Sequence, residues 1–381
     1  MKVLNQYEPV LFDTVGHRVT EVHVHHNYST TLENPADIID AYKDAGYDVL
    51  CISGRPDWRD IDGNYLHAWP WTDLDGREPD PDTVNEEDGA WEGNRDPTDL
   101  DMIAIQGMET ASVTVTHVTT MFTDYNPVDF EYDDGNEYNA LVKMIESDED
   151  ALTLLAHPGR YVESDDRGDW GNGEWEQDFR FDRWFRDLHP GLIGTEVANG
   201  RLNPDDRLLW DELCRKFCPH HRVIGFGADD ASNIPPSAGE TFDSGRTVLL
   251  IDDDDWEPGH ETGPAREAMV SGRSYVTMTD GEDSSEHLTL DSIDHDEDAG
   301  ELTVTIEEDY DYVNWRSGRN TIHNGETLDY EAHSDDIHGY VRCEFVVGDN
   351  AYPGDEDHPP ESILSTQPIL MTDTIVQGEQ A

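Results

Sequence analysis

Short hydrophobic runs, rich in β-branched residues, recur along the first three-quarters of the chain, and most of them end at or beside an ionisable residue. Runs of this kind, separated by turn-forming residues, are typical of β-strands. We expect strands at Val19–His25, Asp48–Ser53, Met102–Glu109, Ser112–Phe122, Leu152–His157, Leu192–Val197 and Val223–Asp229.

Helical patterns lie between several of these runs. In Asn34–Ala45, Pro35 stands near the start and Gly46 follows the end, which is the asymmetry expected of a helix. Asn139–Glu146 and Asp205–Phe217 have a similar pattern. The alternation of β and α segments predicts a parallel α/β architecture.

Two stretches interrupt this alternation. Pro56–Asp101 is rich in Asp, Gly, Pro and Trp, and we interpret it as a long insertion loop. Glu163–Phe179 is a second excursion, rich in Gly and acidic residues. Loops this long in a compact domain are usually functional lids, and the alternative is disorder.

The pattern changes near Asp280. Beyond this residue apolar and polar positions alternate without a helical period, which predicts a small antiparallel, sandwich-like domain. Its strands are expected at His287–Ile293, Glu301–Glu307, Thr321–Ala332, Gly339–Val347 and Pro368–Met371. We therefore predict two domains, an α/β unit over residues 1–280 that contains the insertion at 56–101, and an all-β unit over residues 281–381.

The charge is strongly negative. The chain has 86 Asp and Glu against 24 Lys and Arg, a net charge of −62, and only four residues are Lys. An acidic surface nearly free of Lys suits molar salt, where the Debye length is roughly 3 Å and self-repulsion is screened. We interpret the source as a halophilic cell, the alternative being an acidic protein of an ordinary cell. The sequence has no visible basic patch, which argues against duplex nucleic acid as a partner.

Membrane and disulfide features are not evident in the sequence. No apolar run approaches the roughly 18 residues of a membrane span, and the start of the chain has no signal-peptide core, so we expect a cytoplasmic protein without a membrane partner. Cys214 and Cys218, followed by His220 and His221, could suggest zinc, but an amphipathic helix would direct both thiols into the core, and we favour that interpretation.

Candidate chemistry collects at the ends of the predicted strands. In parallel β/α barrels the functional residues come from the C-terminal ends of the strands. The residues at these positions are His23, His25, Glu109, His117, His157, Glu196, Asp229 and Asp230. His23 and His25 share one face of their strand, because side chains alternate along it, and two imidazoles on one face can chelate Zn, Mn or Fe.

Five short motifs in order resemble those of the PHP (polymerase and histidinol phosphatase) superfamily. They are Glu21-Val-His-Val-His25, Gly107-Met-Glu109, Ala156-His-Pro-Gly159, Gly194-Thr-Glu-Val197 and Gly227-Ala-Asp-Asp230. The resemblance covers about residues 17–280 and depends on the order of the motifs more than on any one of them. It implies a distorted (β/α)7 barrel of the TIM type with metal-dependent phosphoesterase activity.

The resemblance also implies ligand roles. His23, His25 and one Asp of the last motif would bind one metal ion, and Glu109 would bridge to a second ion that His117 and His157 complete. In the superfamily the last motif ends Asp-x-His, so Asp230, with Ser232 two residues later, fits the register better than Asp229.

Departures from the superfamily pattern affect the ligands of a third metal ion. Ser53-Gly54-Arg55 stands in place of an Asp-His pair, Ser232 in place of a His, and Thr30 and Thr31 in place of another. We therefore expect two divalent ions (Mn, Zn or Fe), with the Arg55 guanidinium near the third position and available to bind phosphate. A solvent-exposed Arg55 in the insertion loop is the alternative.

Roles follow for the remaining polar residues. Glu109, Asp230 and Arg55 are the candidate catalytic residues, and Arg55 and Arg160 are the candidate phosphate contacts. An Arg in the position of Arg160 is more often an ordinary surface residue, which is the alternative. Glu196 is expected to orient a ligand histidine.

Three classes of function fit these features. The first is a hydrolase of a small phosphorylated substrate, a phosphomonoester or a small nucleotide. The second is a metallohydrolase acting on another bond, since fold alone does not choose the reaction. The third is a binding or regulatory protein without turnover. The sequence does not indicate the oligomeric state.

Overall fold

The computed structural model describes residues 1–25, 27–28, 31–32, 35–54, 71, 95–111, 117–123, 149–161, 184–187, 191–200, 203–231, 242–259, 262–280, 286–349 and 360–372. Most of the predicted insertion loop, the predicted helix at 139–146 and the acidic excursion at 163–179 lie outside these ranges. Within them, no helix has the length and apolar character needed to cross a membrane.

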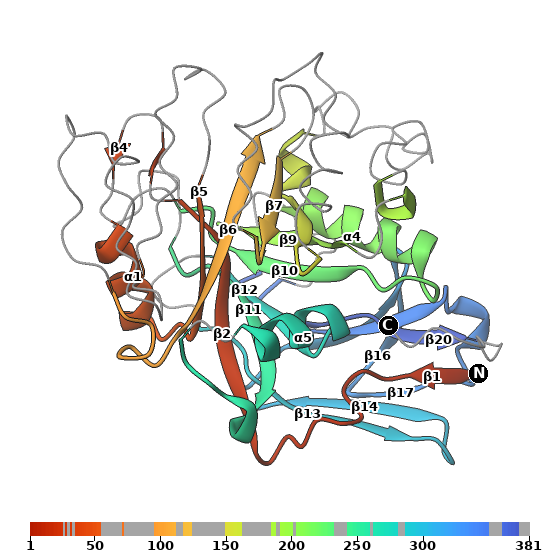
Figure 1. The fold of residues 1–381 in the computed structure, drawn as a ribbon. Helices are drawn as coiled ribbons and strands as arrows, with labels where there is room; N and C mark the ends of the chain where they lie inside the picture. The colour runs from red at the N-terminus through yellow and green to blue at the C-terminus, as the bar shows by residue number, and fades with distance from the viewer. Residues whose placement is uncertain are drawn as a thin grey trace.

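All seven predicted runs contain a strand. In chain order these strands are β2 (Val15–Val24), β5 (Val49–Gly54), β6 (Ile103–Ala111), β7 (His117–Met121), β8 (Leu152–Ala156), β9 (Leu192–Asn199) and β10 (Ile224–Ala228). They lie next to one another in the same order within one large sheet (Figure 1). Residues that are far apart in the sequence are therefore brought to one edge of the sheet.

The expectation of parallel pairing is wrong for β7, which runs antiparallel to both β6 and β8. Only five residues separate Ala111 from His117, whereas a parallel connection needs a crossover of about a dozen or more. The reversal has a consequence for the site, because the N-terminal end of β7, where His117 stands, lies at the edge where its neighbours have their C-terminal ends.

Hydrogen bonds beyond β10 connect the series back to β2. The Asp230 N–H donates to the His23 carbonyl at 2.9 Å, and the His25 N–H donates to the Ala231 carbonyl at 2.9 Å. Val24 and Ala231 form a parallel bridge at the same place. β2 also pairs with β11 (Gly245–Asp252), so the sheet extends beyond the seven strands, and the closed barrel stays a prediction.

Helices are few in the described ranges. The longest are α1 (Pro35–Asp44), α4 (Pro204–Phe217) and α5 (Gly263–Ser271). There are also short 3₁₀ segments, η3 (Pro158–Tyr161), η6 (Asp253–Asp255) and η7 (Ser334–Asp336). The predicted helices at 34–45 and 205–217 are confirmed. α4 begins where the Asn203 side chain accepts the Asp205 N–H at 3.0 Å, with Pro204 in the first turn, as helix-capping preferences predict.

The C-terminal strands extend the same sheet. β12 (Ser274–Thr279) pairs with β19 (Ser362–Thr366), and the sheet continues from β19 through β18 (Tyr340–Val347) and β20 (Ile369–Thr372) to β1 (Lys2–Leu4). Figure 1 shows β1, drawn in red, beside β20, drawn in blue. The division into two domains near residue 280 stays a prediction.

The smaller strands complete the C-terminal part. They are β13 (Leu290–Asp296), β14 (Glu301–Ile306), β15 (Tyr312–Ser317), β16 (Asn320–Asn324) and β17 (Thr327–Asp329), and a further short pair, β3 (Asn27–Tyr28) with β4 (Thr31–Leu32), follows β2. β13, β14 and β17 form an antiparallel sheet of their own, while β15 and β16 join the large sheet through β18.

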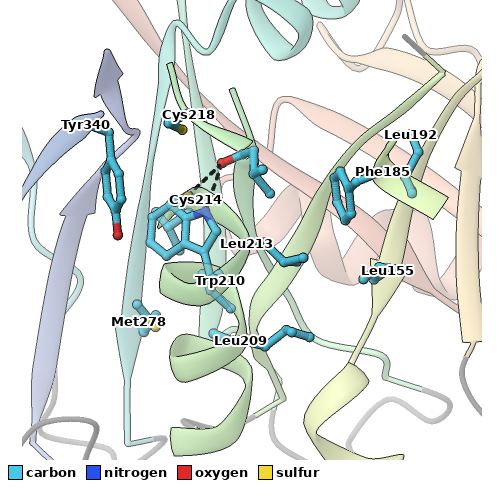
Figure 2. Close-up of a cluster of buried hydrophobic side chains, with 14 of the residues drawn as sticks. Leu155, Phe185, Leu192, Leu209, Trp210, Leu213, Cys214, Cys218, Met278 and Tyr340 are labelled. Atoms are coloured by element: carbon cyan, nitrogen blue, oxygen red, sulfur yellow. Dashed lines mark hydrogen bonds between the residues drawn. The ribbon is translucent and has the colours of Figure 1, made fainter. Parts of the chain in front are cut away.

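A hydrophobic cluster packs α4 against its neighbours. Trp210, Leu213 and Cys214 of α4 are fully buried there, and Tyr340 of β18 lies beside them (Figure 2). The Trp210 indole N–H and the Cys214 thiol both donate to the Val223 carbonyl, at 2.9 and 3.7 Å. Cys214 and its neighbour Cys218 are therefore core residues, as the amphipathic pattern predicts.

Candidate metal centre

Six side chains from five different parts of the sheet converge at one edge. They are His23 and His25 at the end of β2, Glu109 on β6, His117 on β7, His157 after β8, and Asp230 after β10. They form two overlapping groups, His23–His25–Glu109–Asp230 and Glu109–His117–His157, and within each group one ligand atom per residue lies within 4.8 Å of the others. All six predicted ligands are thus brought together.

The first group is centred on the Nε2 atom of His25. This atom lies 3.0 Å from Asp230 Oδ1 and 3.2 Å from Glu109 Oε2. His23 Nε2 is 3.1 Å from His25 Nε2 and 3.4 Å from Asp230 Oδ1. Two imidazole nitrogens and two carboxylates therefore face a common point.

The second group shares Glu109 with the first. His157 Nε2 lies 3.1 Å from Glu109 Oε1, and His117 contacts the same oxygen through its Nδ1. Asp230 Oδ2 is 3.5 Å from His157 Nε2, so Asp230 also faces the second group. Glu109 Oε2 faces His25 of the first group, and Oε1 faces both the second group and His23, at 3.6 Å, so Glu109 lies between the two groups as a bridging carboxylate would.

Acceptors behind the β2 histidines fix the orientation of their rings. His23 Nδ1 lies 2.7 Å from Glu196 Oε1, and His25 Nδ1 lies 2.7 Å from the Ser53 carbonyl. A carboxylate and a carbonyl only accept hydrogen bonds, so each Nδ1 carries a proton and Nε2 is the nitrogen that each ring offers to a metal ion at the centre. Glu196 therefore makes the contact expected of a residue that orients a ligand histidine.

The backbone is left-handed at two of the converging residues. His157 has φ of 31° and Asp230 has φ of 50°, a region that residues other than glycine rarely adopt. Such conformations cost about 1–3 kcal/mol, and they persist only where the surroundings hold them in place. At His157 the backbone N–H donates to Glu196 Oε2 at 2.7 Å, and at Asp230 it donates to the His23 carbonyl.

The electrostatics of the cluster keep the carboxylates ionised. Burial opposes charge on Glu109, but His23, His117 and His157 outweigh it and hold the pKa of Glu109 well below its ordinary value. Burial likewise opposes charge on Asp230, and the neighbouring histidines lower its pKa. In return, Glu196, Asp230 and Glu109 outweigh burial and raise the pKa of His23. The same carboxylates that attract a proton here would attract a metal cation.

Two buried acids that the sequence analysis did not place in a role lie directly behind the centre. Glu21 accepts the backbone N–H groups of His23, at 2.6 Å, and of Asp229, at 3.2 Å, and burial and the Asp229 charge raise its pKa well above the ordinary value. Asp229 accepts the N–H groups of Asp243 and Ser244, so it points away from the cluster that contains Asp230. Because side chains alternate along β2, Glu21 lies on the same face of the strand as His23. This alternation is the sequence signal that could have identified Glu21.

The other predicted site residues lie outside the part of the chain whose side chains the structure describes. Arg55, Ser232 and Thr30 lie outside the described residues. Of Arg160 and Thr31 only the backbone is described, in η3 and β4. The predicted phosphate contacts of Arg55 and Arg160 stay predictions.

Comparison with known proteins gives distant structural matches. No family model matches the sequence, and a search of curated proteins finds no match. One solved structure, described as a two-domain protein containing a predicted PHP-like metal-dependent phosphoesterase from Bacteroides vulgatus ATCC 8482, is 13% identical with a TM-score of 0.44. The match covers 95% of this chain and 88% of that one.

A second match is PsfC from Pseudomonas syringae PB-5123. It is 14% identical with a TM-score of 0.38, and the match covers 67% of this chain and 96% of that chain. Because identity and TM-score are low in both cases, we base the function on the geometry of the centre.

Proposed function

We propose that the chain is a metal-dependent hydrolase of phosphate esters that binds two divalent ions, Mn, Zn or Fe, in the two overlapping groups. One observation carries this proposal: His23, His25, Glu109, His117, His157 and Asp230, spread over more than 200 residues of sequence, present their ligand atoms to a common centre. The (β/α)7 barrel of the PHP superfamily is the frame we propose for these residues.

The donor set fits such ions. Imidazole nitrogen combined with carboxylate oxygen is typical of sites for borderline divalent metals. The β2 rings already have the tautomer that a ligand needs, and a carboxylate shared between two groups fits a pair of neighbouring ions. Bound there, two divalent ions would supply the Lewis acidity that polarises a phosphoryl oxygen and activates water.

The charge of the centre supports an anionic substrate. Of the six converging residues, only Glu109 and Asp230 are acidic, so two divalent cations would leave an excess of positive charge. A phosphomonoester dianion complements that excess better than a neutral amide or ester does. Glu109 and Asp230 position the centre, and we propose Arg55 and Arg160 as the groups that bind the phosphate oxygens.

The experiment that tests this function is hydrolysis of a chromogenic phosphomonoester with Mn²⁺ in molar salt. We expect turnover by the wild-type protein and a loss of more than about 100-fold in His157→Ala. Mutation of residues that only support a ligand costs 10–100-fold in metal affinity or activity, and loss of a ligand itself should cost more. The control is His220→Ala, since His220 is exposed on the loop after α4.

The other two classes of function give different results when amides and cyclic esters are assayed beside the phosphomonoester. A wild-type protein that binds two ions but hydrolyses only amides or cyclic esters would be a metallohydrolase of another bond. A protein that binds the ions and turns over no ester or amide would fit a binding or regulatory role. Either result overturns the phosphoesterase proposal.

A further inference from the structure

The segment that follows His157 rests against the start of α4. In η3, the Gly159 N–H donates to Asp206 Oδ1 at 2.5 Å. Asp206 belongs to the first turn of α4 and its side chain is fully buried. A buried carboxylate that accepts a backbone N–H makes a strong, short hydrogen bond, so this contact fixes the chain two residues after a candidate metal ligand.

The packing at Gly159 leaves no room for a side chain. A Cβ atom there would lie 2.8 Å from Asp206 Oδ1, 2.9 Å from Asn203 Nδ2 and 2.9 Å from the Asp206 backbone nitrogen. The third of these atoms belongs to the backbone, which cannot move aside as the end of a flexible side chain can. The close approach explains the glycine in the Ala156-His-Pro-Gly159 motif.

Buried charges in turn hold α4 to the C-terminal strands. Arg342 of β18 makes a two-pronged contact with Asp211 of α4, at 2.9 and 2.8 Å. Arg207 of α4 donates to Glu344 of β18 at 2.8 Å. Figure 2 shows a second contact between the two elements, in which Tyr340 of β18 lies beside Trp210 of α4 in the hydrophobic cluster.

These contacts bear on His157 because its backbone is left-handed. Two buried carboxylates hold the backbone here. Glu196 accepts the N–H of His157, and Asp206 accepts the N–H of Gly159, two residues later. We propose that Asp206 is a positioning residue for the second metal group, and that α4, anchored by the C-terminal strands, is the support that holds His157 toward Glu109. This inference rests on the two-metal centre proposed above.

The test is the affinity of each metal ion in Asp206→Ala. Titration of the metal-free, full-length protein with Mn²⁺, followed by calorimetry and by the spin-coupled EPR signal of a Mn²⁺ pair, separates the two binding steps. We expect the second ion to bind about 10- to 100-fold more weakly, as for other outer partners of metal ligands, and the first to change by less than about 2-fold. Asp206→Asn keeps an oxygen acceptor and should retain most of the affinity.

A control variant separates positioning from loosening of the helix. Asn203→Ala removes the cap of α4 but leaves the Gly159 acceptor in place. We expect it to bind both ions as the wild type does. Hydrogen exchange gives a readout that needs no metal: the Gly159 N–H should exchange faster in Asp206→Ala and stay protected in Asn203→Ala.

Three results would overturn the inference. Asp206→Ala could bind both ions with wild-type affinity, or it could weaken both ions equally, or Asn203→Ala could reproduce its effect. In each case the two-metal centre of the wild type would still stand. If the wild-type protein binds no Mn²⁺ pair at all, the proposed function fails together with this inference.

Discussion

Glu109 is the residue on which the two metal groups depend together, since His25 contacts one of its oxygens and His157 the other. We predict that Glu109→Gln weakens both metal ions, whereas His25→Ala weakens mainly the first and His117→Ala mainly the second. Each ligand loss should cost more than about 100-fold in affinity. Metal content by elemental analysis and stepwise calorimetric titration measure this. Equal loss of both ions in all three variants would contradict the division into two groups.

A second residue-scale prediction concerns His287, which donates from Nε2 to the Asp243 carbonyl at 2.8 Å. Burial and the nearby Arg246 guanidinium lower the pKa of His287 from its ordinary 6.5 to about 4. Between these values the unfolded chain binds the proton more tightly. The free energy of unfolding is therefore highest above pH 6.5, where His287 is neutral in both states. It falls by about 3 kcal/mol as the pH falls toward 4.

The variant His287→Gln tests this titration, because its amide can donate the same hydrogen bond but does not titrate. We expect the unfolding free energy of the wild type to fall by about 3 kcal/mol relative to that of the variant from pH 7.5 to pH 4, measured by denaturant titration in constant salt. A difference that is independent of pH would show that His287 does not carry this dependence.

At the residue scale the sequence predicts which residues converge better than it predicts the groups that support them. His23 and His25 follow from alternation along one strand, and the remaining ligands from strand ends and the motif order. Glu196 and His23 are separated by 173 residues, and no pattern indicates which of the histidines Glu196 would contact. The Asp206 contact with Gly159 has no sequence signal either, because it depends on how a helix packs beside the site.

At the scale of elements, hydrophobic runs locate strands well but do not give their direction. The run at 112–122 was expected to be parallel, and the short link after β6 is the feature that excludes it. The strands β15 and β19 lie where no run was predicted. Each pairs with a strand next to it in the chain, β16 and β18, and also with one farther away, β18 and β12. Strand position is a local property, whereas pairing depends on the whole chain.

Gly107 shows how an element positions the centre. A Cβ atom there would lie 2.4 Å from Cys51 Sγ on β5 and 2.8 Å from the Thr120 carbonyl on β7. Since Gly107 is two residues before Glu109 on the same strand, Gly107→Ala should displace β6 at the bridging ligand. We predict a loss of about 1–3 kcal/mol in unfolding free energy, as for other overpacked sites, together with weaker binding of both metal ions.

The control for this prediction is Gly263→Ala, because a Cβ atom at Gly263 would meet nothing within 4 Å. It should change the unfolding free energy by less than about 1 kcal/mol and leave metal binding unchanged. Denaturant unfolding and metal titration of the two variants side by side give the comparison. If both variants behave like wild type, the close approach of β5 and β7 does not set the position of Glu109.

At the scale of the molecule, buried ion pairs connect α4 with the C-terminal strands. Glu344 contacts Arg207, Arg316 and Arg342, all nearly or fully buried. Burial opposes its charge, but the three guanidinium groups outweigh burial and hold its pKa well below the ordinary value. We predict that Glu344→Gln costs about 3–5 kcal/mol in unfolding free energy, because it leaves buried cations without their carboxylate.

The matched control is Asp253→Asn, which removes the partner of Arg18 at the surface. Its side chain is 69% exposed, and exposed pairs contribute about 0–1 kcal/mol. Equilibrium unfolding in denaturant measures both variants. Equal costs for the two would contradict the view that the C-terminal strands are bound to α4 by a desolvated network.

The net charge of −62 gives the prediction with the widest reach, because it concerns every part of the fold at once. The Debye length falls from about 10 Å at 0.1 M salt to about 3 Å at 1 M, so repulsion among neighbouring carboxylates is strong in dilute buffer and nearly screened in molar salt. Compact structure concentrates this charge and the unfolded chain spreads it out. Salt should therefore stabilise the folded state, and we predict a melting temperature that rises steeply with KCl up to about 1 M and levels off beyond it.

Screening must be distinguished from the exclusion of salt from the protein surface, which also stabilises proteins. Screening depends on ionic strength and saturates, whereas exclusion depends on the anion and continues to grow with concentration. Melting curves in KCl and K₂SO₄ at equal ionic strength should coincide below 1 M if charge repulsion is the cause. A melting temperature that does not change between 0.1 and 1 M KCl would favour an acidic protein of an ordinary cell, and the halophilic interpretation of the sequence would then be wrong.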